Sequence, residues 1–129
     1  MTFWELFSQA LPAFLEGMGI TLELWAISIL LAVVIGLLCC LMGISKYRVV
    51  RAISNGYINI IRGTPLLVQA FFIYFGVTQA LGIRMTAFVA GTIALCLNAG
   101  AYLSEIFRGG IQAVGPGQME AARSLGLPY

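Results

Sequence analysis

The sequence predicts an all-α membrane protein, and its composition and its long apolar runs are the two observations that predict this class. Of the 129 residues, 60% are hydrophobic and 9% are charged, whereas soluble domains have about 45–50% apolar and about 25% charged residues. The mean hydropathy is +0.97. The apolar residues gather in runs close to the length of about 20 residues that a helix needs to cross a bilayer. Because lipid leaves backbone polar groups without water, we expect these runs to be helical.

Three apolar runs predict three transmembrane helices. The first covers residues 17–44, where Glu23 is the only charged residue, and it is long enough to cross with a tilt. The second covers residues 65–81 and the third covers residues 87–107. Glu23 and the neighbouring Thr21 could contact a passing solute, although a place at the membrane interface costs less.

The residues before the first run, 1–16, place aromatic side chains at nearly helical spacing. This pattern predicts a short helix that lies at the membrane interface. A secretory signal is the other interpretation of an N-terminal apolar segment. It is disfavoured because the apolar run is too long and because Glu5 and Glu16, in place of Lys or Arg, precede it.

The charges between the first two runs predict the orientation. Residues 45–64 contain Lys46, Arg48, Arg51 and Arg62 and no acidic residue, so the positive-inside rule predicts a cytoplasmic loop. An outward N-terminus and a cytoplasmic C-terminus follow from this assignment. We also expect Thr64 to cap the second helix and Pro65 to occupy its first position, where a missing N–H costs nothing.

The third run carries more small and polar residues than a helix surrounded by lipid requires. Its small side chains favour close helix packing, and its polar Asn98 and Glu105 need partners in protein or water. The small residues and Asn98 together are Gly91, Ala94, Asn98, Ala99, Gly100 and Ala101. Two interpretations stay open: Asn98 and Glu105 border a pathway, or Asn98 bonds another helix while Glu105 pairs with Arg108 three residues on.

The composition excludes most enzymatic functions. The chain has no His, and its five acidic residues are all Glu, so common catalytic and metal-binding sets cannot be assembled and no metal or cofactor is expected. Residues 110–117 resemble a phosphate-binding loop, but Pro116 stands where the loop needs Lys. Any nucleotide energy must therefore come from another protein. The three cysteines lie in apolar runs, where they act as small hydrophobic residues. The basic residues are explained by topology, so no nucleic acid is expected as a partner.

A short polar cassette, QMEAARSLG, follows the Gly-Pro-Gly break at residues 115–117. Its residues favour helix, and we expect a cytoplasmic helix over residues 117–126. Ala121, Ala122 and Leu125 would form a small apolar face that another protein could approach closely. Gly126 would let the chain leave the helix in a left-handed conformation. A solvated terminal helix is the alternative.

Three segments in the same order resemble the permease subunits of ABC importers. "EAARSLG" is similar to the first half of the EAA motif of these permeases, and "RGTPLLVQAFFIYFG" and "ALCLNAGAYLSEIFRGGIQAVGPGQ" resemble the polar amino-acid branch, the histidine/glutamine/arginine family. The resemblance covers essentially the whole chain. It implies a transmembrane subunit that forms the translocation pathway for polar or charged amino acids.

The resemblance also implies roles for individual residues. The coupling motif, which sits in a cleft of the ATP-hydrolysing subunit, corresponds to Glu120, Ala121, Ala122, Leu125 and Gly126. The corner before the second span, a structural turn with a possible role in gating, corresponds to Arg62, Gly63, Thr64 and Pro65. The segment bordering the pathway contains Asn98, Gly100, Tyr102 and Glu105.

Permeases of this branch usually have about five spans, and their motif continues past its glycine. By resemblance, residues 1–129 are the N-terminal part of one permease domain that is incomplete at its C-terminus. The implied partners are an ATPase subunit that binds ATP, a second permease subunit, an extracytoplasmic amino-acid-binding protein and the lipid of a bacterial cytoplasmic membrane. A small three-span membrane protein that interacts with or regulates a larger partner is the alternative function.

Overall fold

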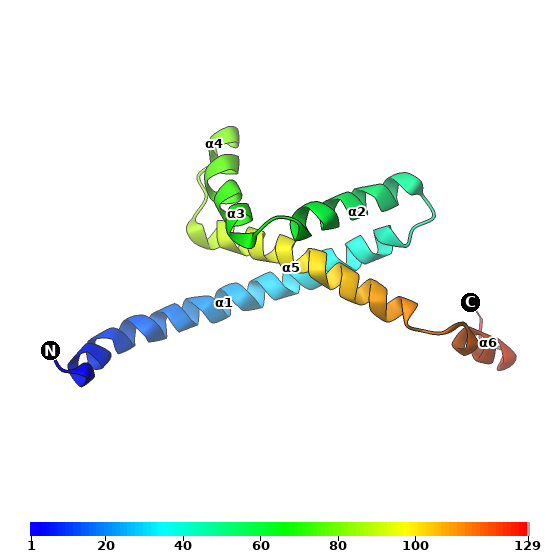
Figure 1. Cartoon of the computed structure of the whole chain (residues 1–129), viewed down its shortest axis with the longest axis horizontal. Helices are drawn as coiled ribbons and strands as arrows, with labels where there is room; N and C mark the ends of the chain where they lie inside the picture. Colours follow the sequence, from blue (N-terminus) through cyan, green and yellow to red (C-terminus); the bar gives the residue numbers. More distant parts are fainter. Residues whose placement is uncertain (129) are drawn as a thin grey trace.

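The computed structural model describes residues 1–128, and nearly all of them are helical; Tyr129 lies outside the described residues. Two long helices, α1 and α5, cross each other and run in the same general direction, while α6 stands apart at one end (Figure 1). In chain order the elements are α1 (Phe3–Gly43), α2 (Arg48–Arg62), α3 (Leu66–Phe71), the π-helical stretch η1 (Phe72–Val77), α4 (Thr78–Leu81), α5 (Ala87–Gln112) and α6 (Pro116–Ser124).

The first helix is longer than the sequence predicts. α1 is one helix of 41 residues, which corresponds to about 60 Å, roughly twice the hydrocarbon thickness of a bilayer. The separate interfacial helix predicted for residues 1–16 is therefore wrong, because Pro12 lies inside α1 without ending it. Thr2 precedes the helix, and its backbone N–H donates to the Glu5 carboxylate at 2.9 Å. Residues 3–16 extend the first candidate span along its axis.

Small side chains let α1 and α5 approach closely. The buried residues of α1 repeat every fourth position, as Ser28, Ala32, Gly36 and Cys40. A Cβ atom added at Gly36 would lie 2.8 Å from Leu103 Cβ, and one added at Gly100 would lie 2.7 Å from Ile35 Cγ2. No real Cβ tolerates such distances, so both glycines are required where the helices cross. This packing is the form that small residues favour between membrane helices.

The segment predicted as a cytoplasmic loop, residues 45–64, contains the helix α2. The segment is mostly helical instead of a loop, and its cytoplasmic placement stays a prediction. The helix has an inward face whose residues recur at helical spacing, namely Val50, Ser54, Tyr57, Ile58 and Ile61. Ser54 is 1% exposed, and its hydroxyl donates to the Cys39 carbonyl at 2.7 Å. The Tyr57 hydroxyl donates to the Leu97 carbonyl. These bonds fasten α2 to both long helices.

A sharp corner separates α2 from the next helical segment. The two axes differ by 106°. Thr64 does not cap α3 as predicted: its hydroxyl donates back to the Ile60 carbonyl at 2.8 Å, at the end of α2. Pro65 takes the cap position with extended backbone, and α3 begins at Leu66. The prediction is wrong by one position, because the Thr64 hydroxyl instead bonds a carbonyl that the end of α2 leaves without a backbone donor.

The all-helical prediction is confirmed for the described residues, which contain two or three candidate membrane spans. α1 and α5 are each long and apolar enough to cross alone. α2 and the segment Leu66–Leu81 pass the same test only together, as a bent pair. Gly82, at φ 65°, ends this pair in a left-handed conformation, and the Thr86 hydroxyl accepts from the Val89 N–H to start α5.

Candidate functional site: a polar cluster on α5 and the exposed helix α6

One carboxylate and two guanidinium groups meet where the corner contacts α5. Arg108 Nη2 lies 2.6 Å from Glu105 Oε2, and Arg62 Nη1 lies 3.7 Å from the same oxygen. The Arg62 guanidinium also lies over the Tyr102 ring, 5.4 Å from its centroid, where a cation is attracted by the face of the ring. The predicted Glu105–Arg108 pair is confirmed. We refer to Arg62, Tyr102, Glu105 and Arg108 as the charged cluster.

Gln69 supports the corner next to this cluster. The Gln69 side-chain amide donates to the carbonyls of Ile61 at 2.8 Å and Thr64 at 3.0 Å. Its own carbonyl accepts from Asn98 Nδ2 at 3.3 Å, so the prediction that Asn98 bonds another helix is confirmed. Gln69 is 8% exposed. Because a buried amide is costly without partners, this one side chain fixes α2, α3 and α5 relative to one another.

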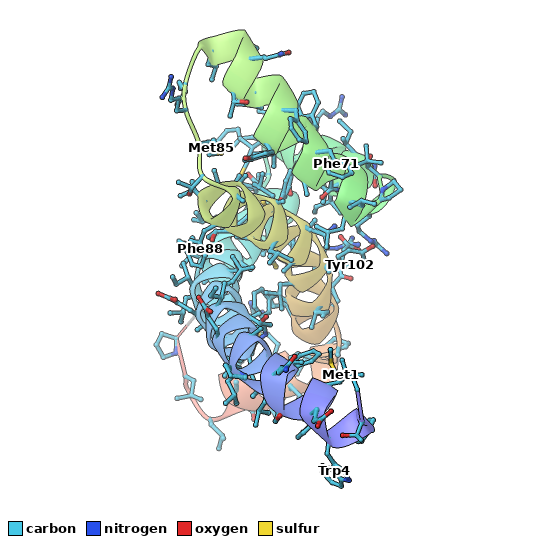
Figure 2. All side chains as sticks on the ribbon, turned by 90° about the vertical axis from the view of Figure 1, so that its left-hand side faces the viewer. Met1, Trp4, Phe71, Met85, Phe88 and Tyr102 are labelled. Atoms are coloured by element: carbon cyan, nitrogen blue, oxygen red, sulfur yellow. The ribbon has the colours of Figure 1, made fainter. Side chains whose placement is uncertain are left out.

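The corner and the third span thus bring together residues that the sequence predicted separately. Arg62 and Thr64 of the corner lie beside Asn98, Tyr102 and Glu105 through the contacts above. Figure 2 shows Phe71 of α3 and Tyr102 of α5 on the same side of the molecule. Gly100 does not join them, because it is buried against Ile35 of α1.

Sequence reasoning missed Gln69, Ser54 and Tyr57. A signal for Gln69 was present, since it is the first polar side chain of the apolar run 65–81. Behind the corner is an apolar cavity of about 530 Å³ between α2, η1 and α5, and Gln69 lies in its wall. Ser54 and Tyr57 were missed because they lie among the basic residues from which a loop was predicted. Thr21 and Glu23 lie elsewhere, exposed on α1, and the Thr21 hydroxyl donates to the Gly17 carbonyl at 2.8 Å.

The second candidate site is the exposed helix α6. Its end is closed by two backbone bonds, Gly126 N–H to the Arg123 carbonyl at 2.9 Å and Leu127 N–H to the Ala122 carbonyl at 3.1 Å. Gly126 has φ 76°, so its predicted left-handed conformation is confirmed, and the pair of bonds is a Schellman motif. Leu125 is 80% exposed. Among the described residues, α6 packs against no other helix.

A short link joins α6 to α5. α5 ends at Gln112 and α6 begins at Pro116. The link starts with a continuation of the helix, because the Ala113 N–H donates to the Gly109 carbonyl at 3.0 Å. α5 packs on α1, α2 and α3. α6 therefore follows directly on a helix that contacts most of the molecule and carries Glu105 and Arg108 of the charged cluster.

Comparisons with known proteins agree with these features. Residues 29–129 match the family described as the binding-protein-dependent transport system inner membrane component. The chain is 43% identical over 119 residues to the arginine transport system permease protein ArtQ of Bacillus subtilis (strain 168), covering 92% of this chain and 54% of that protein. It is 44% identical over 122 residues to the putative glutamine transport system permease protein GlnP of Rickettsia bellii (strain RML369-C), covering 95% and 56%.

A solved structure gives the same result in three dimensions. The crystal structure of an amino acid ABC transporter with histidines contains a chain that matches with a TM-score of 0.90 and 43% identity, over 100% of this chain and 59% of that one. The chain thus spans about half the length of the curated relatives it matches. The charged cluster and the exposed α6 are therefore features of a known family. This chain belongs to the binding-protein-dependent transport system inner membrane component family.

Proposed function

We propose that this chain belongs to the transmembrane subunit of an ABC importer and forms part of the translocation pathway for polar or charged amino acids. A separate ATPase subunit drives the transport. The relatives named for arginine and glutamine transport and the amino acid ABC transporter with histidines support this substrate class. The second candidate, a small membrane regulator, has no comparable support among the relatives.

The observation that carries the proposal is the exposed α6. Its residues Glu120, Ala121, Ala122, Leu125 and Gly126 present small side chains and an apolar tip that no described helix covers. Small side chains allow another protein to approach the helix backbone closely. In the proposal, the ATPase subunit receives α6, and closure of two such subunits moves α5 as a rigid body.

The charged cluster supports a pathway along α5. Ionisable side chains within membrane-spanning segments rarely face lipid, because their charge must be desolvated there. The side chains of Arg62 and Arg108 are 45% and 42% exposed in this chain. In the assembled transporter this side of α5 therefore faces water or protein, and we assign it, with Asn98 and Tyr102, to the pathway. Gly100 contributes by letting α5 pack against α1 instead of by contacting the solute.

Charge along the molecule supports the orientation and the partners. Glu5, Glu16 and Glu23 lie in the first part of α1, and the basic residues lie after its end. By the positive-inside rule, the N-terminus faces outward and α6 faces the cytoplasm of a bacterial inner membrane. α6 then meets the ATPase subunit, which binds the ATP. The outward side meets an amino-acid-binding protein, and a second permease subunit, identical or similar, completes the pathway.

Substitution of Gly126 tests the role of α6 in the transporter that contains this chain. Gly126→Val places a β-branched residue at φ 76°, which costs about 1–2 kcal/mol and weakens docking by about tenfold. We expect uptake and co-purification of the ATPase subunit to fall together while membrane insertion is unchanged.

Two matched variants make the experiment specific. Gly126→Asn keeps a residue that tolerates the left-handed conformation, so it should retain most of the uptake. Gly117 lies in α6, the helix that Gly126 follows, and an added Cβ there meets nothing within 4 Å, so Gly117→Ala should leave uptake unchanged. Normal uptake and normal co-purification in Gly126→Val would contradict the proposed role.

A further inference from the structure

We propose that Arg62 binds the α-carboxylate of the transported amino acid. This inference rests on the proposed function and extends it, because it names the chemical group that the pathway recognises. The sequence assigned the corner residue Arg62 to a structural turn with a role in gating, and not to substrate binding. Its surroundings show a guanidinium that is positioned in advance and incompletely neutralised.

The first step is the charge balance. Two guanidinium groups, those of Arg62 and Arg108, share the single carboxylate of Glu105. Among the described residues, no other acidic side chain forms an ion pair with either of them. The charged cluster therefore keeps one positive charge that a second carboxylate would neutralise.

The second step is the difference between the two arginines. Arg108 is close to Glu105, at 2.6 Å, and follows it by one helical turn on the same helix. Arg62 is farther away, at 3.7 Å, beyond hydrogen-bond distance. A new carboxylate would therefore displace little at Arg62, whereas at Arg108 it would have to break a charge-assisted hydrogen bond.

The third step is the positioning of Arg62. The Tyr102 ring supports one face of the guanidinium, and 45% of the Arg62 side chain remains exposed. The backbone below it is held by Gln69, through the bonds to the Ile61 and Thr64 carbonyls. A planar guanidinium held in this way keeps N–H donors for a carboxylate, which it binds with two parallel hydrogen bonds.

The α-carboxylate is the group that fits this site best. It is common to all amino acids, so one Arg would serve substrates with different side chains. The relatives named for arginine and for glutamine transport differ in the side chain of the named solute and share this group. Arg62 would then recognise the class of substrate, while other residues select within the class.

The test is equilibrium binding to the purified transporter that contains this chain and its ATPase subunit, without the external binding protein. The twenty radiolabelled L-amino acids are compared first, and the best-bound one is then competed with its α-carboxamide, which has the same shape without the negative charge. We expect the wild type to prefer the acid by about tenfold or more. In Arg62→Gln this preference should disappear, and in Arg62→Lys, which keeps the charge but loses the fork, it should be reduced.

Arg51→Gln is the matched control, because Arg51 lies exposed on the same helix and away from the charged cluster. It should keep the full preference for the acid. If Arg62→Gln does not fold, Arg62→Lys alone decides the question, since an unchanged preference there would contradict bidentate recognition.

The remaining outcomes are separable. If Arg62→Gln weakens the acid and the amide equally, Arg62 only holds the corner and the inference is wrong. A wild type that binds the two equally also contradicts the inference and leaves the proposed function standing. A wild type that binds none of the twenty amino acids contradicts the inference, and one that also takes up none of them when ATP and the external binding protein are present contradicts the proposed function.

Discussion

At the scale of single residues, the molecule depends on a few positions where size or hydrogen bonding is fully determined. Gly36 and Gly100 are required because α1 and α5 touch there through backbone and β-carbons. Gln69 is required because three polar groups from three segments meet its amide. Gly126 is favoured because its backbone is left-handed, a conformation that few other residues tolerate. Each requirement has a different physical cause.

The crossing of the long helices gives a prediction for Gly36. Gly36→Ala places a Cβ 2.8 Å from Leu103 Cβ and 3.1 Å from the Gly100 carbonyl oxygen, so the helices must separate. We expect a destabilisation of about 1–3 kcal/mol, as for other overpacked sites. The measurement is the thermal unfolding temperature of the purified protein in detergent.

Gly109→Ala is the matched substitution for this experiment. An added Cβ there meets nothing within 4 Å, and the better helix propensity of Ala stabilises α5 by up to about 1 kcal/mol. The two variants should therefore move the unfolding temperature in opposite directions. Equal unfolding temperatures for Gly36→Ala and the wild type would show that the crossing is looser than described.

At the scale of elements, helices were well predicted from the sequence, and their ends and partners were not. The apolar runs at 17–44, 65–81 and 87–107 all contain helices, because length and hydropathy alone determine them. The join of residues 1–16 to α1 was missed because aromatic side chains at helical spacing indicated a separate interfacial helix, and the same spacing fits one continuous helix. α2 was missed because the four basic residues of this segment indicated a loop, and the helical spacing of its buried residues was not considered.

Some residues of the candidate site were predicted, but Gln69 and the arrangement of the site were not. Asn98 and Glu105 were identifiable because polar groups in an apolar run need partners, and Tyr102 was identified through the family resemblance. Their proximity to Arg62 was not, because it depends on the 106° corner between α2 and α3. Small residues recur at every fourth position of α1, and this spacing could have predicted from the sequence which face of α1 meets α5.

The contact between elements gives a prediction for Gln69. Gln69→Leu leaves the carbonyls of Ile61 and Thr64 and the amide of Asn98 without their partner. We expect a loss of about 1–3 kcal/mol in unfolding free energy and faster proteolysis at the corner. Gln79→Leu, an exposed change at the end of the same segment, should alter neither; similar effects from both would mean that Gln69 is not the tie between the helices.

At the scale of the whole molecule, one helix joins the two candidate functional sites. α5 carries Glu105 and Arg108 of the charged cluster, and within four residues of its end α6 begins. The corner that holds Arg62 is tied to the same helix by Gln69 and Asn98. Because of these ties, a movement of α6 that reaches α5 would carry Glu105 and the corner with Arg62 together. The proposed coupling and the proposed recognition of substrate therefore both depend on α5.

The proposed role of α6 as the coupling helix is tested most directly by its accessibility to a membrane-impermeant maleimide. Cys39, Cys40 and Cys96 are first replaced by Ala, and then Ala121→Cys or, as a control on α2, Val49→Cys is introduced; Val49 is 71% exposed. In inside-out vesicles we predict that both positions are labelled, and that the ATPase subunit protects Ala121→Cys alone. Labelling of Ala121→Cys only from the outer side, or labelling that the ATPase subunit leaves unchanged, would contradict the role of α6 as the coupling helix.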